Sequence, residues 1–334
     1  MGSSFGRSDK GVGGSGHGTN LMTAFFIGDV ALDEYYTADR WPGRADKGMV
    51  KELPAEAGGS IANAAVVHAG LGGDTQFISL LNDSPLSERL IADLRQNGVG
   101  VDHMLIDPAI PESRNFIFLV EGEHIVLTVE MGEQPMWLSG ASLKALRQPG
   151  YLYTTLYRVR RLHAKAQNGV LKQADLLRDL HSNGRRAIFD LDVGGCTPED
   201  MPYLTGAAVV IFNQIGFHTA FGHDDINLIG DWMREHQIDR VVRTLAADGA
   251  EARNHETVLR VPGFTLKVVD VTGAGDTFGG TLTWCLSQDQ SFEEALDFAV
   301  AAASRAVTIH GPRAGKATPE DVLAWRRRHR HQDR

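Results

Sequence analysis

Cysteine is scarce in this sequence, and long hydrophobic runs are missing. The chain of 334 residues has two cysteines, Cys196 and Cys285, and their separation suits neither a metal site nor a disulfide framework. We expect both to be buried thiols in a cytoplasmic protein, because the cytoplasm keeps thiols reduced. Every apolar run is far shorter than the roughly 18 residues of a membrane-spanning helix, so we expect no membrane partner.

Basic residues are outnumbered as well. Lys and Arg total 33 against 42 Asp and Glu, which gives a formal net charge of −9. This excess of negative charge argues against a broad nucleic-acid or anionic-lipid surface, although a local basic pocket for a small anion stays open. The 13 histidines show no metal-ligand spacing, so no metal ligand is assigned from the sequence.

The order of apolar and polar segments predicts an α/β protein. Residues 1–20 are rich in Gly and Ser and indicate a flexible tail, which leaves residues 21–330 for the folded domain. From about residue 151, short apolar runs alternate with polar helical segments, the pattern of a mostly parallel sheet flanked by helices. The strand-like segments within about 33–52 and 113–130 are not followed by helices, so we expect them to form a small separate sheet.

The stretch Val268–Gly280, VVDVTGAGDTFGG, combines four glycines with two aspartates. Residues 265–271 are typical of a strand, and we expect a helix from Asp276 onward. The glycines would then lie at a strand-to-helix junction. Bare N–H groups at such a helix N-terminus attract anions, and glycine lets the backbone approach them closely.

Three interpretations of this junction compete. A tight turn alone would not need two carboxylates around the glycines. A dinucleotide-binding fingerprint fits Gly273, Gly275 and Gly279, but such fingerprints usually open the first βαβ unit, and this one lies near the end of the chain. In the third interpretation, the amides of Gly273, Ala274 and Gly275 stabilise a transferring phosphoryl group. Asp276 then deprotonates the attacking hydroxyl, and we favour this interpretation.

The segment DVTGAGDTF resembles the C-terminal signature of the ribokinase-like (PfkB) carbohydrate kinases. Three other segments agree with that family in the same order: GDVALD at 28–33, GGSIANAA at 58–65 and TLAADG at 244–249. The resemblance implies the ribokinase-like fold, a central mostly parallel sheet flanked by helices with a small β-sheet lid. It also implies an ATP-dependent kinase that transfers the γ-phosphoryl group to a primary hydroxyl of a small sugar. Mg²⁺, a K⁺ ion as in some relatives, and a homodimer formed through the lid are further implications.

The resemblance also assigns roles to individual residues. Asp276 would be the general base, and Asp270 would order the loop, with its carbonyl serving a monovalent cation. Asp33, Gly59 and Asn63 would hold the sugar. The nucleotide would be bound by Thr244, Ala246, Gly249, Asn213 and Gly275.

Three positions depart from the family pattern. Gly216 follows Asn213 at the place where a glutamate of the metal and phosphate network is usual. Ala246 replaces the first glycine of the nucleotide loop, a change that is mild only if φ stays negative. Ala31 replaces a sugar-contacting asparagine of ribokinases, which argues against ribose as the substrate.

The sequence is most similar to the branch of the family that contains the 6-deoxy-6-sulfofructose kinases. The segment GPRAGKATPED at 311–321 and the absence of the glutamate at 216 carry this similarity. An anionic ketose such as 6-deoxy-6-sulfofructose is therefore the expected sugar. Lys47, Arg158 and Arg114 are the candidates to bind its anionic end.

Other functions stay open. A kinase of a neutral ketose is one alternative, and a nucleoside kinase, whose substrate would stack on Tyr35, Tyr36 or Trp41, is another. A non-catalytic sugar-binding descendant of the fold is the third, and the missing glutamate would suit it. The intact pair Asp270 and Asp276 argues against a binding module, which needs no catalytic base.

Overall fold

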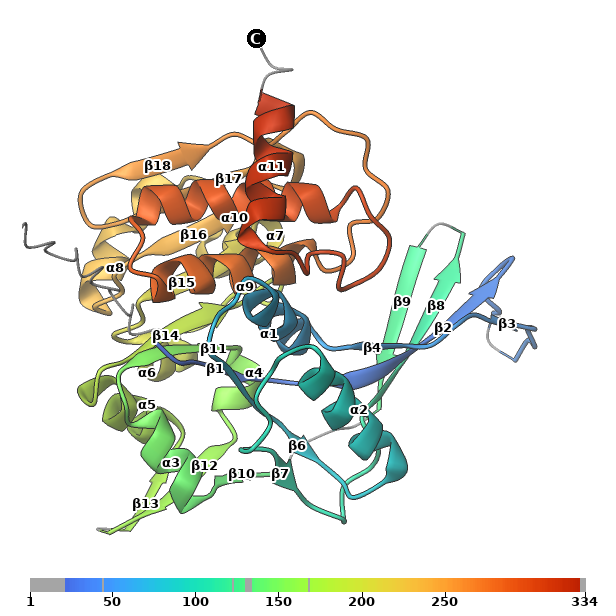
Figure 1. Ribbon diagram of the computed structural model, residues 1–334, viewed down its shortest axis with the longest axis horizontal. Helices are drawn as coiled ribbons and strands as arrows, with labels where there is room; N and C mark the ends of the chain where they lie inside the picture. Colours follow the sequence, from blue (N-terminus) through green and yellow to red (C-terminus); the bar gives the residue numbers. More distant parts are fainter. Residues whose placement is uncertain (1–21, 44, 122, 130–133, 168, 331–334) are drawn as a thin grey trace, which may run out of the picture.

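A computed structural model describes residues 22–330 except 44, 122, 130–133 and 168. The tail expected at 1–20 lies outside the described residues. Figure 1 shows a body built on a large sheet with helices on both faces, and a small sheet that projects from one side. Among the residues described, no helix has the length and apolarity needed to cross a bilayer.

The large sheet confirms the predicted mostly parallel architecture. Its strands are β1 (Ala24–Ile27), β5 (Thr75–Ile78), β11 (Gly150–Thr154), β14 (Arg185–Asp190), β15 (Val209–Asn213), β16 (Val241–Thr244), β17 (Ala250–Arg253) and β18 (Val258–Val261). Their spatial order is β18-β17-β16-β15-β14-β11-β1-β5. The run from β16 to β5 is parallel, whereas β17 and β18 add an antiparallel hairpin at one edge.

Helices cover both faces of this sheet. They are α1 (Ser60–Gly70), α2 (Pro85–Gln96), α3 (Gly140–Leu146), α4 (Leu156–Val159), α5 (Gln173–Ser182), α6 (Met201–Leu204), α7 (Gln214–Phe221), α8 (Gly230–Glu235), α9 (Ala274–Ser287), α10 (Phe292–Ala306) and α11 (Pro319–Arg330). In β1, Ala24 and Phe26 join the core with α1, α9 and α10, while Phe25 and Ile27 join the core with α5 and α7. Successive strand side chains point to opposite faces, so one short strand supports both cores.

Serine side chains cap the starts of two helices. Ser84 accepts a hydrogen bond from the N–H of Ser87 at the start of α2, where a proline takes the first helical position. Ser291 accepts one from the N–H of Glu294 at the start of α10. These caps satisfy N–H groups that have no partner inside the helix, so they fix where each helix begins.

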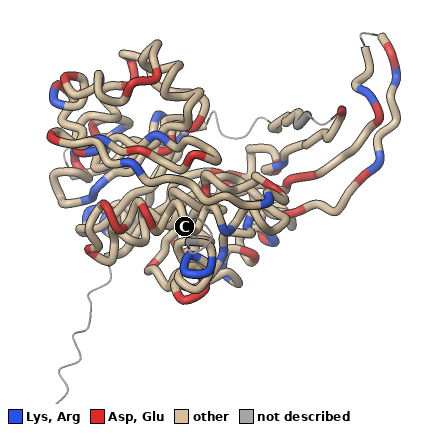
Figure 2. The backbone as a smooth tube through the Cα atoms, turned by 90° about the horizontal axis from the view of Figure 1, so that it is seen from above, with Lys and Arg blue, Asp and Glu red and all other residues tan. Residues whose placement is uncertain are grey.

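A separate small sheet is present, as predicted. It contains β2 (Ala31–Ala38), β3 (Lys51–Glu52), β4 (Glu56–Gly58), β8 (Arg114–Val120) and β9 (Glu123–Thr128). β2 pairs in parallel with β8 and antiparallel with β3 and β4, and β8 and β9 form the expected hairpin. The sheet extends away from the body in both views (Figures 1 and 2).

The prediction of a strand over residues 265–271 is wrong. This segment pairs with no strand among the described residues. The N–H groups of Val269 and Asp270 instead donate to the carbonyl oxygen of Val307, at 2.8 and 3.2 Å. A strand needs a neighbouring strand to satisfy its backbone groups, and here the neighbour is the end of α10. The apolar run is thus a loop anchored to a helix.

Several short elements carry no clear signal in the sequence. They are the three-stranded sheet of β10 (Met136–Leu138), β12 (Leu162–Ala166) and β13 (Gly169–Lys172), the pair β6 (Leu80–Leu81) and β7 (Leu105–Ile106), and the single-turn helix α4. Segments of two to five residues are too short to show a helical or strand period. Only packing in three dimensions decides their conformation.

Helices α1 and α9 lie side by side over the large sheet (Figure 1). They come close together at Gly280, where an added Cβ would overlap the carbonyl oxygen of Ala64. The missing side chain at position 280 therefore sets the distance between the two helices.

We expect Gly280→Ala to lower the free energy of unfolding by about 1–3 kcal/mol, because the extra methyl forces α9 away from α1. Chemical denaturation measures this change. Gly140→Ala is the matched control, since a Cβ there meets nothing within 4 Å. A Gly280→Ala protein as stable as the control would contradict the close helix contact.

Candidate active site

The N-terminus of α9 has the geometry of an anion-binding turn. Gly273 caps the helix in the left-handed region at φ 74°, and a Cβ there would overlap the carbonyl oxygen of Pro312, so this position requires glycine. Within the described chain, the N–H groups of Gly273 and Gly275 have no backbone acceptor, whereas that of Ala274 donates to Val271 at 3.2 Å. Two of the three predicted amides are therefore available to an anion at the helix N-terminus.

Asp276 lies in the first turn of α9 and is half-buried. Its Oδ2 accepts a hydrogen bond from Nδ2 of Asn63, on α1, at 2.9 Å. Burial raises the pKa of Asp276 to about 7; the Asn63 hydrogen bond lowers it, and the charges of Asp190 and Asp192 add to the rise. A carboxylate with a pKa near neutrality suits proton transfer at physiological pH.

A second carboxylate lies beside this helix. The hydroxyl of Tyr153 donates to Oδ2 of Asp190 at 2.6 Å, and a Cβ at Gly279 of α9 would overlap that hydroxyl. Burial raises the pKa of Asp190 to about 6, against the lowering effect of the Tyr153 hydrogen bond. The glycine thus lets the tyrosine and its aspartate lie directly against α9.

The residues predicted to hold a sugar come together near Asp276. Asp33, on β2, is buried, and its Oδ1 accepts a hydrogen bond from Nδ2 of Asn115 at 2.7 Å. Burial raises its pKa, which the Asn115 hydrogen bond partly offsets. Gly59 has φ 101°, and a Cβ there would overlap the carbonyl oxygen of Asp29. The turn before α1 can therefore be made only by glycine, and it delivers Asn63 to the site.

Arg313 also belongs to this cluster, although no role is predicted for it from the sequence. Its Nε donates to Oδ1 of Asn63 at 3.1 Å, and its Nη1 forms an ion pair with Asp93 of α2. The segment that contains it was noted only for its family resemblance. Its partners precede it by 250 and 220 residues, so no local pattern could have revealed these contacts.

Asp270 ties together the two loops next to the α9 N-terminus. Its Oδ1 accepts from the N–H of Thr272 at 2.9 Å, and its Oδ2 accepts from the N–H of Gly311 at 3.0 Å. Burial alone would raise the pKa of Asp270, but these two hydrogen bonds outweigh it and hold the pKa below its usual value. Such a fixed carboxylate has the geometry that a loop-ordering role requires.

The departure at Gly216 has a steric cause. An added Cβ at this position would overlap the carbonyl oxygen of Asp192, so no glutamate fits there without moving the turn after β14. Asn213 caps α7 by accepting from the N–H of Gly216 at 2.8 Å. Its Nδ2 donates to Oδ1 of Asp192 at 2.7 Å. The exposed Asp192 carboxylate therefore lies beside Asn213, where the family's glutamate is absent.

The loop from Thr244 to Gly249 is tightly closed. The N–H of Leu245 donates to the carbonyl oxygen of Gly249 at 2.8 Å, and Gly249 has φ 94°, where a Cβ would overlap the carbonyl oxygen of Val261. Ala246 has φ 50°. The replacement of glycine by alanine at 246 is thus the strained case and not the mild one, because φ is positive.

The basic residues predicted to bind an anionic sugar lie in different settings. Arg158 is on α4, and not at a strand end; it is buried and forms an ion pair with Asp29. Burial lowers its pKa to about 10. Arg114 opens β8 and pairs with Glu34 at 2.8 Å, while Lys47 is exposed. Both guanidinium groups are therefore already held by carboxylates.

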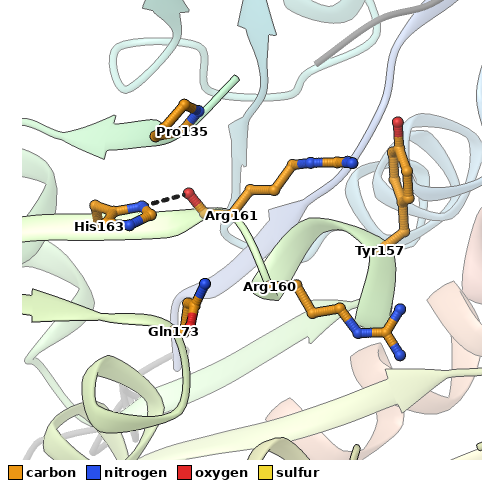
Figure 3. Close-up of a pocket in the computed structure, with 6 residues that line it drawn as sticks. All are labelled: Pro135, Tyr157, Arg160, Arg161, His163 and Gln173. Carbon is orange, nitrogen blue, oxygen red and sulfur yellow. Dashed lines mark hydrogen bonds between the residues drawn. The ribbon is translucent and has the colours of Figure 1, made fainter. Parts of the chain in front are cut away.

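A cavity of about 320 Å³ beside α4 contains none of these clustered residues. It is lined by Pro135, Tyr157, Arg160, Arg161, His163 and Gln173. In Figure 3 the Arg161 side chain extends toward Tyr157, whereas Arg160 points elsewhere; Arg160 forms an ion pair with Asp200. The guanidinium groups of Arg160 and Arg161 do not point toward a common position in the cavity. We therefore place the candidate active site at Asp276 and not in this cavity.

A glycine-capped helix N-terminus beside a carboxylate, next to the carboxyl ends of parallel strands, is a place where α/β proteins bind anionic ligands such as phosphate groups. The pfkB family carbohydrate kinase model matches residues 24–319. The chain belongs to the pfkB family of carbohydrate kinases. It is therefore an enzyme of the class that transfers a phosphoryl group to an alcohol.

Curated relatives and solved structures agree with this assignment. The chain is 22% identical over 306 residues to the ribokinase of Bacillus subtilis, and the match covers 89% of this chain and 96% of that protein. It is 26% identical over 284 residues to fructokinase-1 of Oryza sativa subsp. japonica, covering 80% and 87%. The structure of Arabidopsis thaliana ribokinase complexed with ribose and ATP superposes with a TM-score of 0.77, at 23% identity, covering 91% and 98%. These likenesses confirm the ribokinase-like fold.

We expect Ala246→Gly to raise the free energy of unfolding by about 1 kcal/mol, because glycine adopts positive φ without the strain that alanine bears. Thermal and chemical denaturation measure this. Ala247→Gly is the control, since its φ is not among the positive ones; it should lower stability. If both variants destabilise the protein equally, residue 246 carries no backbone strain.

Proposed function

We propose that this carbohydrate kinase transfers the γ-phosphoryl group of ATP to a primary hydroxyl of a small sugar, with Asp276 as the general base. The observation that carries the proposal is the 2.9 Å hydrogen bond from Asn63 to Asp276. It joins the helix expected to hold the sugar to the helix expected to hold the phosphoryl group. A hydroxyl bound at Asn63 would lie within reach of the base.

The amides of Gly273 and Gly275 would stabilise charge on the transferring phosphoryl group, with Ala274 completing the turn. Asp33, Gly59 and Asn63 would orient the sugar hydroxyls. Phosphoryl transfer depends mainly on positioning and charge stabilisation, and this cluster supplies both.

ATP would lie along the other side of the α9 N-terminus. Two similar structures, the Arabidopsis thaliana ribokinase and the fructokinase of Xylella fastidiosa, were solved with ATP. Thr244, Ala246 and Gly249 form the closed loop expected to meet the nucleotide, and Asn213 lies at the start of α7. These elements follow adjacent strands, β16 and β15, so one ligand could contact both.

Mg²⁺ would accompany ATP and neutralise charge on its phosphates. Among the described residues, no three His, Cys, Asp or Glu side chains gather as a metal site, which fits an ion held mainly by phosphate oxygens and water. The exposed Asp192, bonded to Asn213, is the carboxylate placed to contact the ion's water shell. We also propose a monovalent cation, K⁺, at the backbone carbonyl of Asp270.

The proposed sugar is an anionic ketose, of which 6-deoxy-6-sulfofructose is the example that the sequence resemblance favours. Lys47 is exposed on the segment between β2 and β3 and can move to an anionic group. Arg114 and Arg158 would have to share their carboxylate partners, Glu34 and Asp29. This pairing favours a neutral ketose as the second candidate, because neither guanidinium is then disturbed.

A nucleoside is less well supported. The ring of Tyr36 stacks on Phe118 at 5.4 Å, and Trp41 packs edge-on against the same ring at 5.3 Å. Aromatic rings that already pack on one another have less surface to offer a base. Tyr35 lies on the same strand, and burial raises its pKa to about 12.

We also propose that the small sheet is the lid of the sugar site and that the protein forms a cytoplasmic homodimer through this sheet. Met49, Val50, Val126 and Leu127 are large apolar side chains exposed on that sheet and its connection. An apolar surface of this kind is typical of an interaction site. Val126 and Leu127 point to opposite faces of β9, so a second copy of the sheet packed on one face would cover one of these two side chains.

Asp276→Asn should lower turnover on the order of a thousandfold, because it removes the base. Sugar binding, measured by calorimetry, should be largely retained. Asp239→Asn, at a surface ion pair with Arg186, is the control, and normal turnover by Asp276→Asn would refute the assignment.

The base must be deprotonated to act, and burial raises its pKa to about 7. Wild-type kcat/KM should therefore rise with pH through about 7.

Lys47→Ala should reduce kcat/KM for an anionic ketose by roughly tenfold or more, since a charge-assisted hydrogen bond contributes about 1.5–3 kcal/mol. A neutral ketose should be hardly affected. A coupled kinase assay over sulfonated, phosphorylated and neutral ketoses and nucleosides measures both, with Lys51→Ala as the matched exposed lysine. Equal losses on both sugars would eliminate the role of Lys47 in reading the anion.

A further inference from the structure

The Arg313 guanidinium connects three elements around the proposed sugar site. Its Nε donates to Oδ1 of Asn63 on α1, and its Nη1 pairs with Asp93 on α2. Its positive charge also lowers the pKa of Asp33, although burial of Asp33 outweighs this effect. The arginine side chain is 16% exposed, so it has little freedom to leave this position.

The two ends of the Asn63 amide have different partners. Its oxygen accepts from Arg313 at 3.1 Å, and its nitrogen donates to the Asp276 carboxylate at 2.9 Å. An amide oxygen only accepts hydrogen bonds, while the amide nitrogen only donates them. A flipped amide would place its oxygen against a carboxylate and its nitrogen against a guanidinium, and both contacts would be repulsive. Arg313 therefore selects the orientation in which Asn63 donates to Asp276.

The loop that carries Arg313 is fixed to the start of α9. Asp270 accepts from the N–H of Gly311 at 3.0 Å, and the carbonyl of Pro312 packs against Gly273 so closely that a Cβ at 273 would overlap it. A Cβ at Gly315 would likewise overlap the hydroxyl of Thr277. The guanidinium is thus held in register with Asp276, one residue before Thr277.

We propose that Arg313 is a positioning residue for phosphoryl transfer, which fixes the Asn63 amide so that it donates its hydrogen bond to Asp276. The proposal rests on the proposed function of Asp276 as the general base. Arg313 does not contact Asp276 itself. It acts through Asn63.

The sign of the expected effect follows from the groups around Asp276. The titratable and charged groups that face it are Asp33, Tyr153, Asp190, Asp192 and, through Asn63, Arg313. The aspartates raise the pKa of Asp276, whereas the Asn63 hydrogen bond lowers it. Losing that bond moves the pKa upward, because the charged form loses its donor. The acidic limb of kcat/KM then moves to higher pH.

Arg313→Met tests the proposal, because it keeps a long apolar stem and removes every donor. We expect the acidic limb of kcat/KM to move upward by about half a pH unit or more, the direction set by the lost donor. Asn63→Ala should move it at least as far. In the Asn63→Ala background, Arg313→Met should produce no further shift, because residues that act through one contact are non-additive.

Two results would overturn the proposal: an unmoved limb in Arg313→Met, or a full additional shift in the double variant. If Arg313→Met does not fold, the Asn63→Ala profile alone decides, since an unmoved limb there removes the path through Asn63. Arg305→Gln is the matched control, because Arg305 donates to the carbonyl oxygen of Ala314 in the same loop without contacting Asn63. An equal shift in that control would mean that loop order, and not the Arg313 hydrogen bond, sets the profile.

The failure of the proposed function gives a different outcome. If Asp276→Asn keeps normal turnover, the base is misassigned. If Asp276→Asn is inactive while Arg313→Met leaves the limb in place, the base stands and only the positioning role falls.

Discussion

The hydrogen bond between Asn63 and Asp276 depends on the close contact of two helices. Asn63 is on α1 and Asp276 on α9, and Gly280 allows α9 to lie against the carbonyl of Ala64. Both helices are packed on the strands of the large sheet, in one continuous apolar core. The alignment of Asn63 with Asp276 therefore depends on this helix contact. The glycines of residues 273–280 contribute to helix packing as well as to the anion-binding turn.

Several carboxylates lie around Asp276. Burial raises the pKa of Asp276 from 3.8 to about 7. The folded protein consequently retains a proton that the unfolded chain releases between about pH 4 and 7, so this contribution to stability is present below pH 4 and lost as pH rises through 7. A base tuned to neutral pH is thus a local source of instability, a common property of active sites.

At Gly216, the departure from the family pattern is accompanied by a second feature of the structure. Gly216 leaves room for the turn that carries Asp192, and Asp192 bonds to the asparagine that caps α7. A carboxylate of the neighbouring loop thus lies beside Asn213, near the position where the family pattern has a glutamate on the helix. Ala246 has no such compensation, since its φ of 50° leaves the alanine strained.

The sequence by itself determined the local chemistry. The glycines at a helix start and the adjacent Asp276 were predictable, because backbone freedom and charge are properties of the residues themselves. Asp33 and Asn63 were predicted as site residues from the family resemblance alone, and both lie near Asp276. The alternation of strands and helices likewise predicted the parallel sheet, since strands buried on both faces read as short continuous apolar runs between polar helical segments.

Tertiary structure alone decided which partners these residues meet. The run at 265–271 is apolar enough for a strand, yet it binds the end of α10 because no strand lies beside it. Arg158 and Arg114 were expected to face an anion, but each pairs with a carboxylate of its own. Arg313 reaches Asn63 across 250 residues. Such pairings depend on how distant segments pack. The sequence around a charged residue does not show which residue it will pair with.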